Sequence, residues 1–131
     1  MTTSAPTGRS GRPARLPDRR DFLRVQAGKR CAMPGFVLQI APRPSDLPPS
    51  GTAGPRVGFT VSRKVGNAVE RNRVRRRLRA LAATALRRPL RCDLDYVLVG
   101  RKEALGRDFT ALTAELEKAL DRLGARLPAT P

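Results

Sequence analysis

Basic side chains are concentrated in one stretch of this sequence, between residues 63 and 91. The single acid there is Glu70, and the eleven basic residues are Arg63, Lys64, Arg71, Arg73, Arg75, Arg76, Arg77, Arg79, Arg87, Arg88 and Arg91. Like charges spaced i, i+4 on a helix repel each other, and a merely solvated helix would normally mix Glu with Lys. Because guanidinium groups suit phosphate, the stretch predicts a site for a polyanion.

The charge excess extends to the whole chain. Its 131 residues contain 27 lysines and arginines against 11 acids, which gives a formal net charge of +16. This balance is typical of nucleic-acid-binding proteins. A membrane surface fits less well, because the apolar side of the basic stretch is rich in alanine and lacks Trp and Phe.

Several classes of function are excluded by what the composition lacks. Histidine is absent, which removes Ser/His/Asp and Cys/His catalysis and histidine-ligated metal sites. Cys31 and Cys92 match no metal spacing and no disulfide framework, so a reducing cytoplasm is the simplest setting. No apolar stretch approaches the roughly 20 residues that a membrane-spanning helix needs.

Local periodicity places the basic stretch inside a small α/β domain. We expect strands over 36–41, 56–62 and 94–100, and helices over 16–27, 67–88 and 108–123. Asn67 followed by Glu70 resembles a capping box, and Pro89 prevents the helix from continuing. We expect two or three strands before the second helix, and the resulting order, αβββαβα, predicts a two-layer α/β sandwich, a small mixed sheet with helices on one face.

Domain boundaries follow from the segments that cannot contribute to a core. Residues 1–15 are small, polar and basic, and we expect a disordered tail there. Five prolines and two glycines between Pro42 and Pro55 predict a long surface loop. The single nucleic-acid-binding domain is then 16–124, followed by a disordered C-terminus over 125–131.

A helical projection divides the predicted helix over 67–88 into two sides. The apolar side holds Val74, Leu78, Leu81, Ala82, Ala85 and Leu86. The opposite side holds Asn72, Arg73, Arg76, Arg77 and Arg79. Arg71 is the exception, because it falls near the apolar side in the first turn. The arrangement predicts one face for the core and one for an anionic ligand.

The segment 57–76, with sequence VGFTVSRKVGNAVERNRVRR, closely resembles the signature of the bacterial ribonuclease P protein component. Its R-N-R core is Arg71-Asn72-Arg73. A weaker likeness runs outward from Arg15-Leu16 to Arg101-Lys102. The resemblance implies that the strand ending near Ser62, the basic helix and the strand from Leu94 form a left-handed crossover, a rare arrangement. It also implies a ribonucleoprotein endoribonuclease that removes the 5′ leader of precursor tRNA, with chemistry carried by RNA and Mg²⁺.

The resemblance assigns site residues to two surfaces. It assigns contact with the catalytic RNA to Arg63, Lys64, Arg71, Asn72, Arg73, Arg75, Arg76 and Arg79. Asn72 is also implicated near a hydrated Mg²⁺. The second surface is a cleft between the first helix and the sheet for the single-stranded leader, with candidate liners Phe22, Gln26, Gln39, Thr60 and Ser62.

The two glutamines of that cleft stand where some family members carry aromatic residues. Stacking contributes roughly 1 to 3 kcal/mol per base, so leader contact at Gln26 and Gln39 would depend on amide hydrogen bonds instead. For Phe22, a role in the core alone is an equally good interpretation.

We therefore expect an accessory subunit, one protein with one catalytic RNA, that has no catalytic residue of its own and also contacts precursor tRNA. The alternative is a structural RNA-binding protein of ribosomal or chaperone type. A third hypothesis is a protein-only nuclease using paired carboxylates, Asp18/Asp21 or Asp93/Asp95. Neither pair has the context of a metal site, and helix capping and solvation at a strand edge explain them better.

Overall fold

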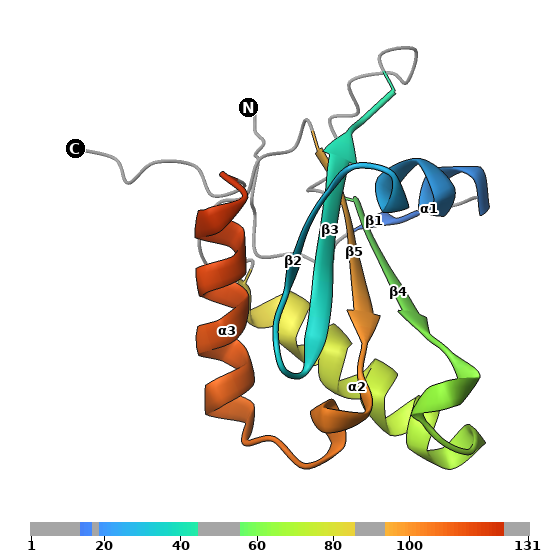
Figure 1. Cartoon of the computed structure of the whole chain (residues 1–131), viewed down its shortest axis with the longest axis vertical. Helices are drawn as coiled ribbons and strands as arrows, with labels where there is room; N and C mark the ends of the chain where they lie inside the picture. The colour runs from blue at the N-terminus through green and yellow to red at the C-terminus, as the bar shows by residue number, and fades with distance from the viewer. Residues whose placement is uncertain (1–13, 17–18, 45–55, 86–93, 125–131) are drawn as a thin grey trace, which may run out of the picture.

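A computed structural model describes residues 14–16, 19–44, 56–85 and 94–124 of the chain. This part of the chain forms five strands, three α-helices and two short 3₁₀ helices, η1 and η2 (Figure 1). Their order and bounds are β1 (Ala14–Arg15), α1 (Arg19–Gln26), β2 (Lys29–Ala32), β3 (Phe36–Pro42), β4 (Arg56–Val61), η1 (Arg63–Val65), α2 (Ala68–Ala85), β5 (Leu94–Gly100), η2 (Lys102–Leu105) and α3 (Phe109–Arg122).

The strands form one mixed sheet in the order β1-β4-β5-β3-β2. β4 runs parallel to β5 and to β1, whereas β3 is antiparallel to both β5 and β2. Because β4 and β5 are parallel neighbours, the chain between them must cross over one face of the sheet, and α2 makes this crossing (Figure 1). In Figure 1 both strands run downward, β4 lies to the right of β5 and α2 lies behind them, so the crossover is left-handed, as the resemblance implies, although nearly all such units are right-handed.

Both faces of the sheet are covered, by different helices. Phe36, Leu38 and Ile40 of β3 point into a large core that α2 and α3 complete. The alternate residue Ala41 joins a smaller core on the other face, together with Val25 of α1. The expectation that all helices share one face is therefore wrong for α1, because β3 and β5 have apolar side chains on both faces and each set needs a cover.

The main core rests on close packing between α2 and the sheet. Val74, Leu78 and Leu81 of α2 are fully buried. Gly100, at the end of β5, permits this approach, since a Cβ there would lie 2.5 Å from Val74 Cγ1. The apolar side predicted for the helix is thus the side that packs on the sheet.

The predicted elements are present, with shifted ends. β5 has the predicted bounds, β3 gains Pro42, and β4 ends at Val61 rather than at residue 62. The two shortest strands were not predicted individually. One of them, β1, consists of Ala14 and Arg15, which the sequence assigns to the tail, and it pairs with the start of β4. The rest of the tail, most of the proline-rich loop, the predicted end of α2 and residues 125–131 lie outside the described residues.

Candidate RNA interface

A 3₁₀ helix and a capping box orient the start of α2. Ser62 follows β4, and its Oγ accepts a hydrogen bond from the Lys64 backbone N–H at 3.3 Å. The Asn67 side-chain oxygen accepts from the Glu70 N–H, and the Glu70 carboxylate accepts from the Asn67 N–H, each at 2.9 Å. This reciprocal pair is the predicted capping box, and it satisfies two backbone donors that the first turn would otherwise leave unpaired.

The residues predicted to bind RNA lie together on η1 and the first four turns of α2. We call this set the α2 basic surface, and its members are Arg63, Lys64, Arg71, Asn72, Arg73, Arg75, Arg76 and Arg79. All are exposed except Arg71 and Arg75, which are half-buried. None of its cations forms an ion pair with another described residue. Its positive charge is therefore uncompensated by the described part of the protein.

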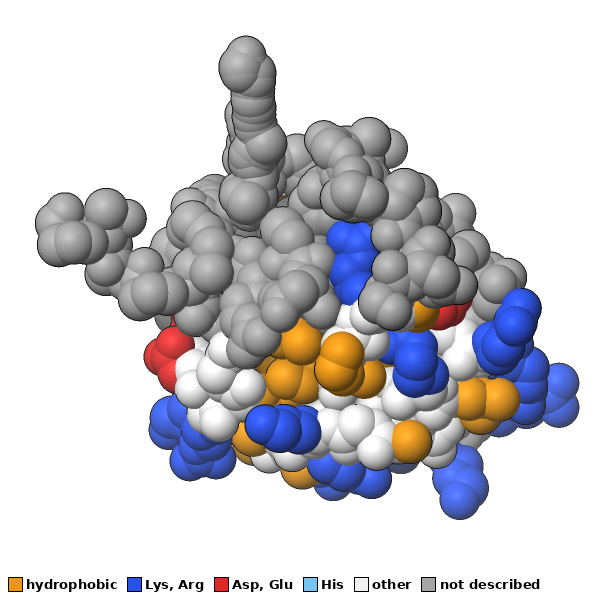
Figure 2. All heavy atoms as spheres, turned by 90° about the horizontal axis from the view of Figure 1, so that it is seen from above, with side chains coloured by type: hydrophobic (Ala, Val, Ile, Leu, Met, Phe, Trp, Pro, Cys, Tyr) orange, Lys and Arg blue, Asp and Glu red, His pale blue; other side chains and the backbone are white. Residues whose placement is uncertain are grey.

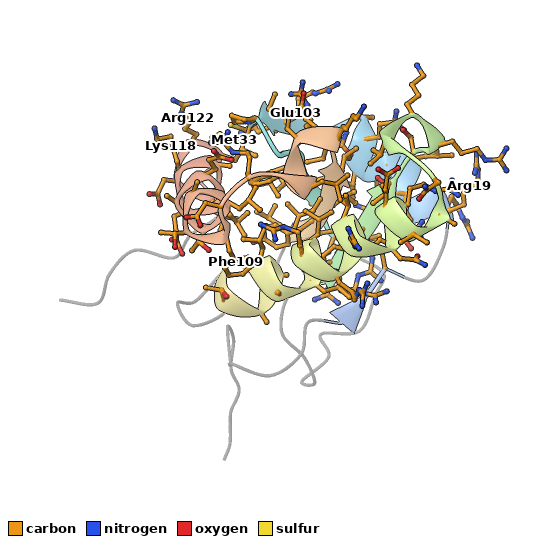
Figure 3. All side chains as sticks on the ribbon, turned by 90° about the horizontal axis from the view of Figure 1, so that it is seen from below. Arg19, Met33, Glu103, Phe109, Lys118 and Arg122 are labelled. Atoms are coloured by element: carbon orange, nitrogen blue, oxygen red, sulfur yellow. The ribbon has the colours of Figure 1, made fainter. Side chains whose placement is uncertain are left out.

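Two arginines of α2 meet aromatic rings. The Arg79 guanidinium lies over the Phe59 ring of β4, 6.0 Å from the centroid. The Arg77 guanidinium lies at the same distance over Phe109 at the start of α3 and donates to the Arg107 carbonyl oxygen (Figure 3). Arg77 was expected on the outward side with Arg73 and Arg76, but it is half-buried and links α2 to α3. This exception arises because α3 and η2 cover part of the predicted outer side.

The predicted leader residues are only partly brought together. Phe22 of α1 packs on the smaller core and lies so close to β4 that a Cβ at Gly58 would be 2.5 Å from its ring. Thr60 of β4 is half-buried on that same face of the sheet, by strand alternation from Gly58. Gln39 of β3 shares this face and is 7% exposed. Phe22 thus lies on the same side of the sheet as Gln39 and Thr60.

The other two predicted leader residues, Gln26 and Ser62, are exposed. Gln26 is the last residue of α1 and is exposed. Ser62 was expected on the polar sheet face, but it lies beyond the end of β4, where its hydroxyl caps η1. This placement gives Ser62 a local structural role.

A buried ion-pair network joins α1 to the sheet, and the sequence did not predict it. Asp95 of β5 is fully buried. Its Oδ1 accepts from Arg56 Nε at 2.9 Å, its Oδ2 accepts from Arg56 Nη2 at 2.7 Å, and Arg24 Nη2 donates to the same Oδ2. Asp21 of α1 binds both arginines, at 2.9 Å to Arg24 and 3.3 Å to Arg56. Arg43 adds a longer contact to Asp95, at 3.8 Å.

The network keeps its arginines charged. Burial lowers the pKa of Arg24, but hydrogen bonds and charge from Asp21 and Asp95 outweigh it, so the net shift is upward. The hydrogen bond to Asp95 raises the pKa of Arg56 against a smaller effect of burial. Both guanidinium groups therefore stay protonated throughout the neutral range, and their contribution to stability does not vary with pH there.

Comparison with known proteins assigns the family. A family model described as Ribonuclease P matches residues 11–124. The chain belongs to the ribonuclease P protein family. The ribonuclease P protein component of Paramagnetospirillum magneticum is 50% identical over 113 residues, which cover 85% of this chain and 83% of that protein. The corresponding protein of Bartonella quintana is 40% identical over 108 residues, 82% of this chain and 81% of that protein.

Solved structures agree with this assignment. The ribonuclease P protein of Thermotoga maritima superposes with a TM-score of 0.62 at 30% identity, covering 82% of this chain and 96% of that one. The Staphylococcus aureus ribonuclease P protein, at 23% identity, shares the fold with a TM-score of 0.65 over 86% of this chain and 97% of that one. This ribonuclease P protein is accordingly a subunit of an endoribonuclease that works with an RNA subunit.

The two described members of the predicted carboxylate pairs form ion pairs with arginines. Asp21 and Asp95 are held by arginines, and Asp95 is a buried partner rather than a solvated strand-edge residue. Their predicted partners, Asp18 and Asp93, lie outside the described residues. Within the described ranges no three His, Cys, Asp or Glu side chains come together as metal ligands.

On one face of the described structure, basic side chains are more common than acidic ones (Figure 2). Seen from above, Lys and Arg side chains are spread around it and acidic side chains are sparse (Figure 2). No helix among the described residues is long and apolar enough to cross a membrane.

Proposed function

We propose that this chain binds the catalytic RNA of ribonuclease P through the α2 basic surface, as one protein with one RNA subunit. The observation that carries this assignment is the uncompensated charge of that surface. Its exposed members, including Arg73 and Arg76, have no acidic partner in the described residues, and dense like charge on one helix is self-repelling. Phosphates of an RNA backbone would neutralise it and release counterions.

The second part of the proposal concerns the 5′ leader of precursor tRNA. The sheet face beside α1 offers Phe22, Gln39 and Thr60, an aromatic ring with an amide and a hydroxyl. This combination suits a single strand, whose bases stack on aromatic rings and expose their edges to hydrogen bonds. Holding the leader there would favour the precursor over the mature tRNA.

The metal requirement is proposed to rest with the RNA. On the α2 basic surface the protein offers the exposed Asn72 amide, while the nearby Glu70 carboxylate is engaged by the Asn67 N–H. One amide oxygen fits contact with the water shell of Mg²⁺ but not a protein-held ion, since Mg²⁺ demands near-octahedral oxygen ligands. Protein cations near the RNA would lower the Mg²⁺ concentration needed for cleavage. We place this activity in the bacterial cytoplasm.

The test is cleavage of a 5′-extended precursor tRNA by the same organism's ribonuclease P RNA at low Mg²⁺, with and without the protein. We expect strong stimulation, with cleavage at the mature 5′ end. Tight RNA binding without stimulation would overturn the proposal and favour the structural RNA-binding alternative. Cleavage by the purified protein without RNA would favour the nuclease hypothesis.

A further inference from the structure

The buried Asp95 carboxylate connects segments that are far apart in the chain. Arg24 of α1 reaches it across 71 residues of sequence, and Arg56 of β4 reaches it across 39. Arg24 also donates from Nη1 to the Pro42 carbonyl oxygen at 2.5 Å, at the end of β3. One side chain of α1 is thus attached to two neighbouring strands, β3 and β5.

The apolar contact that otherwise holds α1 on the sheet is small. The core on this face consists of Leu16, Val25, Ala41 and Val97, with Phe22 and Val99 packed against it. The large core, in contrast, lies wholly on the opposite face. The position of α1 therefore depends strongly on the directional hydrogen bonds of Arg24, because apolar contacts alone are not directional.

Phe22 lies next to residues of the ion-pair network in both α1 and β4. It follows Asp21, which binds Arg24 and Arg56, and its ring is pressed against Gly58, two residues along β4 from Arg56. A small tilt of α1 would move the ring relative to Thr60 and Gln39, which lie on the rigid sheet. Stacking on a base is sensitive to such a displacement, since rings and bases must overlap.

We propose that Arg24, acting through Asp95, is a positioning residue for the leader of precursor tRNA. It fixes α1, and with it Phe22, at the distance from the sheet that the leader requires. This inference rests on the leader site of the proposed function. It assigns to Arg24 an effect on substrate selection that does not involve contact with the RNA.

The test changes Arg24 rather than Asp95, because loss of the buried carboxylate would leave its arginines without their shared partner and endanger folding. Arg24→Gln removes the ion pair, whereas Arg24→Lys keeps a charged donor. Arg122→Gln is the control, since it makes the same change of charge at an exposed residue of α3, on the far side of the molecule from Arg19 and α1 (Figure 3). Holoenzyme reconstituted with each full-length chain is assayed on a long-leader precursor and on one with a single leader nucleotide.

We expect Arg24→Gln to raise KM for the long-leader precursor by about fivefold or more, as removal of one stacked base would. The KM for the short-leader precursor, kcat, and affinity for the catalytic RNA should stay as in the control. Arg24→Lys should retain most of the wild-type preference. If Arg24 acted only in folding, Arg24→Gln would lower affinity for the catalytic RNA and raise KM for both precursors together.

Two results would overturn the inference, and they differ. If the wild type prefers the long leader and Arg24→Gln retains that preference, α1 is positioned without Arg24, and the leader site stands. If the wild type shows no preference for the long leader, the leader site itself is absent and the inference fails with it.

Discussion

Arg73 and Arg76 of α2 are exposed and have no ion pair with another described residue, whereas Arg24 and Arg56 each bind two carboxylates between α1 and the sheet. The residue type is the same in both regions. What differs is the acid, since Asp21 and Asp95 serve the second region and no described acid serves the first. An excess of arginine therefore does not by itself locate an RNA-binding surface, and the distribution of its acidic partners does.

The largest expected effect is on protein stability, from removal of the buried Asp95 carboxylate. Asp95→Ala leaves Arg24 and Arg56 without the carboxylate they share, and removing one partner of a buried ion pair costs about 3–5 kcal/mol. Urea unfolding followed by circular dichroism measures the change in stability. Asp121→Ala, at an exposed position of α3, is the matched control and should change stability by less than about 0.5 kcal/mol. Equal destabilisation of the two variants would mean that the network does not stabilise the fold.

Charge reversal on the exposed α2 basic surface should lower RNA affinity without lowering stability. The double variant Arg73→Glu/Arg76→Glu should weaken binding to the catalytic RNA about 100-fold, since two charge-assisted hydrogen bonds contribute about 1.5 kcal/mol or more each. The slope of log affinity against log salt should become shallower by about 0.7–0.9 for each phosphate that the protein no longer neutralises. Stability should not decrease, because repulsion on α2 is relieved. Unchanged affinity for the RNA would rule out this interface.

The sequence predicted the exposed side well because its signals are local. The apolar period of α2 and the Asn67 to Glu70 spacing both lie within one helix, and the structure confirms both. Arg77 departs from the helical projection because of its contact with Phe109, and α3 is a distant part of the chain. A projection of one helix contains no information about what packs on it.

The buried side was not predicted because its partners are distant in sequence. The signal available was one acid, Asp95, inside the otherwise apolar run of β5, and it was interpreted as a strand-edge residue. Similarly, the apolar residues on both faces of β3 indicated that a helix must cover each face, which would have placed α1 correctly. The two-residue β1 and the mostly polar β2 show no periodicity, and only their pairing with longer strands reveals them.

Lysine substitutions keep the charge but change the geometry of the donor, so they should affect Arg56 of the buried network and Arg73 and Arg76 of α2 differently. Arg56 donates from both Nε and Nη2 to the two oxygens of Asp95, a paired contact that an ammonium group cannot reproduce. Arg56→Lys should therefore lower the free energy of unfolding by about 1–2 kcal/mol. Arg73→Lys/Arg76→Lys should change RNA affinity less than about threefold, because lysine also binds phosphate as a point charge. A large decrease in RNA affinity for the second variant would mean that these arginines make bidentate or stacked contacts to the RNA.

The smallest expected effect concerns the capping box that starts α2. Asn67→Ala removes the side-chain acceptor for the Glu70 N–H and should lower the free energy of unfolding by about 1 kcal/mol, whereas Asn67→Ser keeps an acceptor and should retain most of it. Thermal unfolding of the two variants checks this difference, and equal destabilisation would show that the cap does not stabilise α2. Because the main core on Val74, Leu78 and Leu81 still holds the helix, affinity for the catalytic RNA should fall far less than in the Arg73/Arg76 charge reversal. The charge of α2 would then be the determinant of RNA binding, and its cap a determinant of how stably that charge is presented.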